Sequence, residues 1–140
     1  MTTLNLDQKA AQYAQQIIKV SIAKSEDAKS VENLVTKALG VLQEQGVYAL
    51  ILFLYSRTGK EEKLAPHIRE KLYSLLKVIP ALSEIGSIPD DSRHADVLKY
   101  YSDHVCEDLY TLLFVKDLYE QTLIYARYGA KAEGKSEGKA

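Results

Sequence analysis

The residue types that most often bind metals or act as nucleophiles come together once in this 140-residue chain, in the segment "DHVCED". It places His104 two residues before Cys106 and flanks the pair with Asp103 and Asp108. On a helix, side chains two residues apart point in different directions, so His104 and Cys106 are a poor ligand pair. A zinc site needs four converging ligands, and a nucleophilic cysteine needs a base supplied by the fold. We therefore predict no metal, no cofactor and a structural role for Cys106.

Two other patterns resemble catalytic motifs, but both are incomplete. The segment "RTGKEE" (57–62) has the glycine and lysine of a phosphate-binding loop but lacks the earlier glycine, so we interpret it as a turn between helices. The carboxylate pairs Glu61/Glu62 and Asp90/Asp91 are adjacent in sequence. That spacing suits helix caps and solvated faces better than general acid–base catalysis. The sequence therefore predicts a protein that is not an enzyme and that works by binding.

The distribution of charge is uneven, although the formal net charge of the whole chain is only −1. Residues 1–82 contain 11 Lys and Arg against 8 Asp and Glu, whereas residues 83–108 contain 2 against 7 and residues 109–140 contain 5 against 4. Such a distribution can give the fold one basic and one acidic surface. A basic surface can hold a phosphate backbone; the alternative is an ordinary solvated helix surface.

Tyrosine is the dominant aromatic residue, with ten copies against two phenylalanines and no tryptophan. A tyrosine can stack on a nucleobase, or it can pack in a helical core with its hydroxyl group in water. Core packing accounts for most of the ten. The segment "ARYGAK" instead combines Arg127, Tyr128 and Lys131 near the end of the chain, and it is a candidate contact point for RNA or a partner.

The elements that would carry these residues are predicted to be helices throughout. Apolar residues recur at spacings of three and four from Leu6 to Val20, from Val31 to Leu42 and from Leu64 to Ile79, which is typical of amphipathic helices. Residues 47–57 begin with nine apolar residues in a row, a run too short to span a bilayer. We interpret it as a helix buried nearly all round, with a strand as the competing interpretation.

Residues 95–128 are also predicted to be helical, with a break near Ser102–His104. From residue 109 onward this helix is apolar on almost every side, which is typical of a helix at the centre of a bundle. The small, polar residues 130–140 are expected to form a disordered tail. The predicted fold is all-α: a single-domain bundle of about five to six helices over residues 1–129. The single cysteine and the lack of a signal-peptide pattern predict a cytoplasmic protein.

Capping residues mark the ends of several of these helices. Asn5 with Gln8 resembles a capping box at the start of the first helix, and Thr58 with Glu61 resembles one further along the chain. Gly46 is placed to end the second helix by taking a left-handed backbone conformation.

The region around the predicted fourth helix contains all three prolines of the chain. Pro66 should lie in the first turns of this helix, where a missing backbone N–H costs least. Residues 80–92 are predicted to be a loop, ended by an acidic cap at Asp90 or Asp91.

Three segments resemble a known family: "LDQKAAQYA", "VLQEQGVYALILFLYSRTGK" and "DLYTLLFVKDLYEQTLIYARYGAKA". They resemble the small helical subunit of the CRISPR type III-B effector, the Cmr complex, and the similarity covers most of residues 4–131. The family opens with a basic residue in an alanine-rich helix, a position held here by Lys9. Its second helix ends in a polar residue, a glycine and an apolar residue, and the apolar helix that follows closes on a basic residue. Here residues 45–47 form the junction, and Arg57 holds the closing position.

The resemblance implies a protein without nuclease activity of its own that contacts the guide and target RNA while other subunits cut. Phosphate contacts require basic groups and little reading of base edges. Lys9 and Arg57 are candidates because they match family positions. Four further candidates are chosen only as basic residues on helix faces expected to be exposed: Lys19, Lys60, Arg69 and Arg127.

The same resemblance implies other CRISPR effector subunits and further copies of this chain as partners. A basic N-terminal part and the acidic segment 83–108 would suit head-to-tail stacking, because such contacts join unlike surfaces. Two alternatives stay open. The chain can be a helical protein–protein adaptor without a nucleic-acid role, or the small subunit of a related CRISPR effector.

Overall fold

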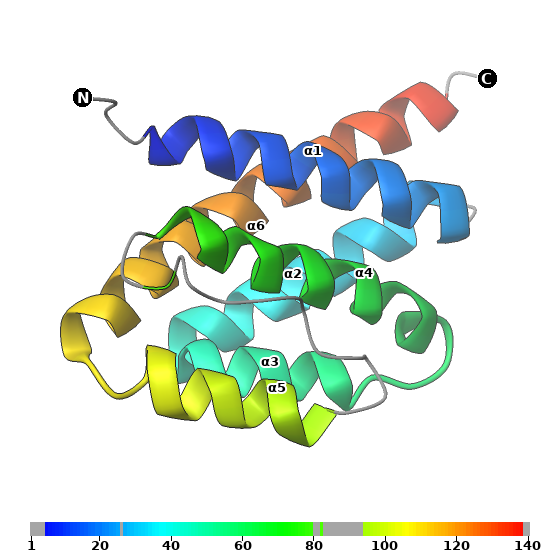
Figure 1. Ribbon diagram of the computed structural model, residues 1–140. Coiled ribbons are helices and arrows are strands. Elements are labelled where there is room, and N and C mark those ends of the chain that lie inside the picture. Colours follow the sequence, from blue (N-terminus) through cyan, green and yellow to red (C-terminus); the bar gives the residue numbers. More distant parts are fainter. Residues whose placement is uncertain (1–4, 26, 80–81, 83–93, 139–140) are drawn as a thin grey trace.

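The computed structural model describes residues 5–25, 27–79, 82 and 94–138, and over these residues the chain is almost entirely helical (Figure 1). The described residues form six α-helices, and this part of the chain contains no strand. The helices are α1 (Leu6–Ser25), α2 (Ala28–Gln45), α3 (Val47–Tyr55), α4 (Lys60–Leu75), α5 (His94–Tyr100) and α6 (Leu109–Gly138). The all-α bundle predicted from the sequence is confirmed, and the apolar run that forms α3 is a helix.

Helix α6 packs chiefly against α1 and α2, and α1 packs in turn against α4. Helices α3 and α5 lie together at the lower side in Figure 1, away from α1. None of the helices in the described ranges has both the length and the apolar character needed to cross a membrane. The core is built mainly from leucine and isoleucine, and its largest fully buried members include Ile17, Leu34, Leu42, Leu50, Ile51, Leu54, Leu64, Ile68, Leu72 and Leu75.

Two of the predicted helix ends are confirmed. The side-chain oxygen of Asn5 accepts a hydrogen bond from the backbone N–H of Gln8 at 3.0 Å, which caps α1. Gly46 has φ of +100°, a value that favours glycine, and its N–H donates to the carbonyl of Leu42 at 3.0 Å. Because its own carbonyl accepts from Leu50, this one glycine ends α2 and begins α3.

The predicted capping box of Thr58 and Glu61 is wrong. Helix α4 begins at Lys60 after Gly59, which has a positive φ of 64° and makes no side-chain cap. The carboxylate of Glu61 does not cap the helix, because it binds Lys37 of α2 and Arg57. Ion pairs are therefore found where the sequence predicted a local cap.

Pro66 lies inside α4, in its second turn, as the sequence predicted. The predicted loop at 80–92 and its cap at Asp90 or Asp91 lie outside the described residues, apart from buried Leu82.

The break between α5 and α6 comes slightly later than predicted. The helix widens into a π-helical turn at Tyr101–Val105, and residues 106–108 between this turn and α6 belong to no helix. The wider turn directs both Tyr101 and Val105 into the core. Asp108 then caps α6, because its Oδ2 accepts from the N–H of Thr111 at 3.0 Å.

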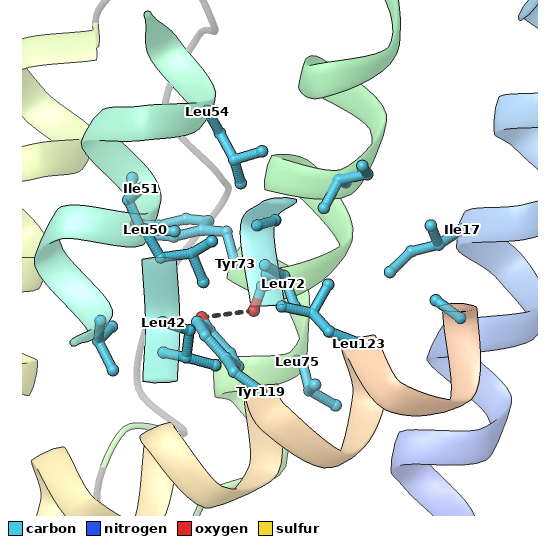
Figure 2. Packing of buried hydrophobic residues seen from close by; sticks show 14 of the residues in the cluster. Ile17, Leu42, Leu50, Ile51, Leu54, Leu72, Tyr73, Leu75, Tyr119 and Leu123 are labelled. Atoms are coloured by element: carbon cyan, nitrogen blue, oxygen red, sulfur yellow. Dashed lines mark hydrogen bonds between the residues drawn. The ribbon is translucent and has the colours of Figure 1, made fainter. Parts of the chain in front are cut away.

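A buried pair of tyrosines joins this turn to α6 and α4. Tyr119 donates its hydroxyl proton to the carbonyl of Leu72 at 2.7 Å, as Figure 2 shows. A hydroxyl group has one proton, so Tyr101, whose oxygen lies 2.7 Å from that of Tyr119, must be the donor of their shared hydrogen bond. Burial raises the pKa of both groups, and both hydroxyls stay protonated. The network gives a hydrogen-bond donor to a carbonyl in the last turn of α4, where carbonyl groups lack N–H partners within the helix.

Two predictions, the complete burial of α3 and the end of α6, need correction. Helix α3 is not buried all round, because Tyr48 and Leu52 are exposed while Leu50 and Leu54 are covered. Helix α6 does not end near Tyr128 but continues to Gly138, and Ala130 is fully buried. Any disordered tail therefore begins later than residue 130.

Candidate nucleic-acid interface

The six basic residues predicted to contact RNA do not form one cluster. Lys9 and Lys19 lie on α1, where Lys9 is half-buried and Lys19 is exposed. Arg57 follows α3, and Lys60 and Arg69 belong to α4. Arg127 is exposed on α6. Their environments separate them into groups with different capacities to bind an anion.

Arg69 is buried, with only 5% of its surface exposed, so its expected position on an exposed helix face is wrong. Its guanidinium carbon lies 3.9 Å from the centre of the Tyr55 ring, in cation–π geometry. Burial lowers the pKa of Arg69, and the interaction with Tyr55 counteracts this effect. Arg69 joins α4 to α3 and is poorly placed to reach RNA.

Arg57 is held in place by contacts within the chain. Its guanidinium lies 3.8 Å from the centre of the Phe53 ring, and its Nε donates to the carbonyl of Phe53 at 3.1 Å. Its Nη1 lies 3.3 Å from the carboxylate of Glu61. Arg57 thus satisfies the end of α3 and ties it to α4.

Lys60 belongs to the same region of paired charges. Its ammonium lies 3.5 Å from Asp27 at the start of α2, while Lys37 lies 2.9 Å from Glu61. Partial burial acts to raise the pKa of Glu61, but hydrogen bonds from Lys37 and Arg57 outweigh it, and the pKa is lowered. A groove of about 310 Å³ runs between these groups, lined by polar side chains of α2 and α4. The two lysines of this groove already have carboxylate partners, so an anion would have to displace the carboxylates of Glu61 and Asp27.

The C-terminal turns of α6 present a different arrangement. Arg127, Lys131 and Lys135 are all exposed, and their spacing of four places them on one face of the helix. Ala126 and Ala130, which pack into the bundle, are fully buried. None of the three makes an ion pair with a residue in the described ranges. We call these three residues the basic stripe.

Tyr128 lies beside the basic stripe with 66% of its surface exposed. The sequence pattern indicates Arg127, Tyr128 and Lys131, but it does not indicate Lys135, which lies in the segment expected to be a disordered tail. The continued spacing of four was the signal that could have found it.

A groove lies between the C-terminal half of α6 and α1. Its volume is about 760 Å³, and small or aliphatic side chains form most of its walls. Gly129 brings the two helices close, because a Cβ atom there would lie 3.3 Å from Cγ1 of Ile18. Tyr125 also binds Asp7 of α1 through its hydroxyl, and this hydrogen bond raises the pKa of Tyr125. The groove is lined by Ala11, Ala14, Gln15, Ile18, Lys19, Ile22, Ala23, Tyr125, Gly129, Ala132 and Glu133.

The first turns of α6 expose a second surface that the sequence did not predict. Four large apolar residues that were assigned to a buried central helix face solvent instead. We call them the apolar patch: Leu109, Tyr110, Leu113 and Phe114. Contiguous exposed apolar side chains of this size are typical of a surface that contacts a partner.

The His104 and Cys106 region shows no assembled site. His104 is exposed and lies against the ring of Tyr100, with 4.6 Å between ring centres. Burial raises the pKa of the Cys106 thiol, which lowers its reactivity. The described residues contain no group of three metal-ligating side chains.

Comparisons with known proteins add no relative. No protein-family model, curated protein or solved structure matches this chain.

Proposed function

We propose that this chain is a non-catalytic small subunit of a CRISPR type III-B ribonucleoprotein, and that it holds guide or target RNA by its phosphates. The observation on which the proposal rests is the basic stripe, which combines three exposed cations without carboxylate partners among the described residues. The resemblance of three segments to the small Cmr subunit supplies the biological setting. Cutting of RNA is assigned to other subunits.

The geometry of the basic stripe suits a polyanion. Four residues advance an α-helix by about 6 Å, which is close to the separation of successive phosphates along an extended strand. Exposed ammonium and guanidinium groups bind phosphates without reading the bases. Binding by such groups should be weak in the isolated chain and should fall as salt rises.

The six predicted contact residues are therefore ranked by their environment. Arg127 is the strongest candidate, followed by Lys19 on the exposed side of α1 and the half-buried Lys9. Arg57 and Lys60 can contact RNA only by exchanging their carboxylate partners. Arg69 is assigned a structural role.

Purification of the tagged full-length chain from its native cells, followed by sequencing of the bound RNA, tests this function. We expect enrichment of guide RNAs that carry CRISPR repeat sequence, together with other effector subunits. Charge reversal of the basic stripe to glutamate should reduce the retained RNA. A matched triple of exposed lysines reversed to glutamate should not: Lys29, Lys63 and Lys77. Absence of guide RNA from the wild-type preparation would reject the function.

A second function is favoured by the apolar patch, whose four residues are suited to a protein surface more than to RNA. In this alternative the chain is a helical adaptor that joins other proteins and has no contact with nucleic acid. Within the first proposal, the same patch serves contacts with other subunits or with another copy of the chain. The two functions differ in one result: an adaptor retains its partners after nuclease treatment and after reversal of the basic stripe.

A further inference from the structure

Two strongly exposed tyrosines lie on the same helix in opposite surroundings. Tyr110 and Tyr128 are 83% and 66% exposed, and they are 18 residues apart. This separation corresponds to about five turns of an α-helix, so both side chains lie on the same side of α6. Tyr110 belongs to the apolar patch, whereas Tyr128 lies beside the basic stripe.

We propose that Tyr128 is a stacking platform for one base of single-stranded RNA whose phosphates lie on the basic stripe. The inference rests on the proposed function and adds to it the kind of RNA that is bound. A tyrosine ring offers a flat apolar face on which any base can stack. A base can use that face only when its own face is free, so single strands are selected over duplexes.

Helical spacing places the ring of Tyr128 between the basic stripe and the apolar groove that lies between α6 and α1. Lys131 is three residues after Tyr128 and is therefore its neighbour on the helix surface. Tyr125 is three residues before Tyr128 and Ala132 is four after it, and both line the groove between α6 and α1. A base on Tyr128 thus has phosphate-binding groups on one side and apolar surface on the other.

The ring of Tyr128 has no structural use within the described part of the chain. It makes no ring contact and no hydrogen bond with the described residues, whereas Tyr73, Tyr100, Tyr101 and Tyr119 form a contiguous aromatic cluster. An exposed ring among free cations is the combination that single-strand binding surfaces use.

Equilibrium binding of the purified full-length chain to a labelled, unstructured single-stranded RNA tests the inference. We expect Tyr128→Ala to weaken binding by about 5- to 150-fold, while Tyr128→Phe binds like the wild type. Tyr110→Ala is the matched control and should leave affinity unchanged. The salt dependence should also distinguish the two kinds of contact. Tyr128→Ala keeps the wild-type slope, whereas reversal of the basic stripe lowers the slope of log affinity against log salt by about 2.

The absence of tryptophan from the chain allows a direct optical test. Tyr128→Trp introduces a single tryptophan, whose fluorescence should be quenched when single-stranded RNA is added but not when duplex RNA is added. Tyr110→Trp should show no quenching. Circular dichroism checks that each variant stays folded.

The outcomes separate this inference from the function on which it rests. If the wild type binds RNA through the basic stripe but Tyr128→Ala binds equally well, or if Tyr128→Trp is not quenched, the stacking role is rejected and the phosphate contacts stand. If the wild type binds no RNA, both are rejected.

Discussion

The two ends of α6 face solvent with different chemistry, although they belong to one continuous helix. At the N-terminal end the apolar patch is exposed, and the charged residues near it are mainly acidic: Glu107, Asp108, Asp117 and Glu120 against Lys116. At the C-terminal end the basic stripe and Tyr128 are exposed. Between them, Leu118, Tyr119 and Leu123 are buried against the rest of the bundle.

This contrast indicates that one helix holds two surfaces at a fixed separation. The distance from Leu109 to Lys135 along the helix axis is about 39 Å. A protein bound at the apolar patch and RNA bound at the basic stripe would therefore not compete for the same atoms. A subunit that bridges protein and RNA needs this arrangement, and an isolated adaptor does not.

The largest expected effect comes from making the apolar patch polar. Leu113→Asp combined with Phe114→Asp should weaken binding of partner subunits at least about 30-fold, because truncated anchor residues at interfaces commonly cost this much. RNA affinity of the free chain should not change. Quantitative pull-down and RNA titration of the same variant measure both quantities.

Leu52→Asp, at an exposed leucine of α3, is the matched control for these changes. It should keep the partners. If it releases them equally, or if the double variant also loses RNA, the two ends of α6 are not separate surfaces.

The next effect concerns the buried middle of α6. Tyr119→Phe removes the donor to the Leu72 carbonyl and the acceptor for Tyr101, and should lower the free energy of unfolding by about 2 kcal/mol. Tyr101→Phe leaves the Tyr119–Leu72 bond intact and should cost about 1 kcal/mol. Urea denaturation measures both. Equal losses would mean that the assigned direction of the hydrogen bonds is wrong.

The docking of the basic end onto α1 depends on Gly129. Gly129→Leu should lower the free energy of unfolding by about 1–2 kcal/mol, because its side chain would meet Ile18. Gly134→Ala is the matched control. A Cβ there would lie 3.9 Å from Ala28, an ordinary contact, so alanine should stabilise the helix by about 0.5–1 kcal/mol. Thermal melting distinguishes the two signs, and stabilisation by both changes would contradict close packing of α6 on α1.

Most of the fold could be predicted from the sequence, because apolar spacing and caps are local signals. Asn5 caps the start of α1 and Gly46 ends α2 through hydrogen bonds to residues no more than four positions away. The role of Glu61 could not be predicted in the same way, because Lys37, one of its two partners, is 24 residues away. The end of α6 was also missed: its last turns contain small and polar residues, and burial of Ala130 depends on the rest of the bundle.

The candidate site could be predicted only in part. Arg127, Tyr128 and Lys131 stand together in the sequence, and their spacing was readable. Whether a basic side chain has a partner depends on the tertiary structure. Arg57 contacts Phe53 and Glu61, and Arg69 contacts Tyr55, although the sequence does not distinguish these arginines from Arg127. A helix apolar on almost every side likewise does not reveal which side stays uncovered. The apolar patch was therefore assigned to the core.

The smallest effect should appear at the first turn of α6 at low pH. Hydrogen bonds from the side chain and backbone N–H of Thr111 hold the pKa of Asp108 below its ordinary value. A lowered pKa in the folded state stabilises the fold above the unfolded pKa, near 4, and this stabilisation is lost as pH falls through the folded pKa. Asp108→Asn keeps a capping group but does not titrate. The wild type should therefore lose more stability than Asp108→Asn between about pH 6 and pH 3.

Hydrogen exchange can locate this loss within α6. Residues 109–112 should exchange faster in the acidified wild type, while the turns around the basic stripe should keep their protection because no carboxylate cap holds them. Exchange that rises equally at both ends would show that α6 opens as one unit. In that case the two surfaces would be coupled through the helix, and binding at one end would change the order of the other.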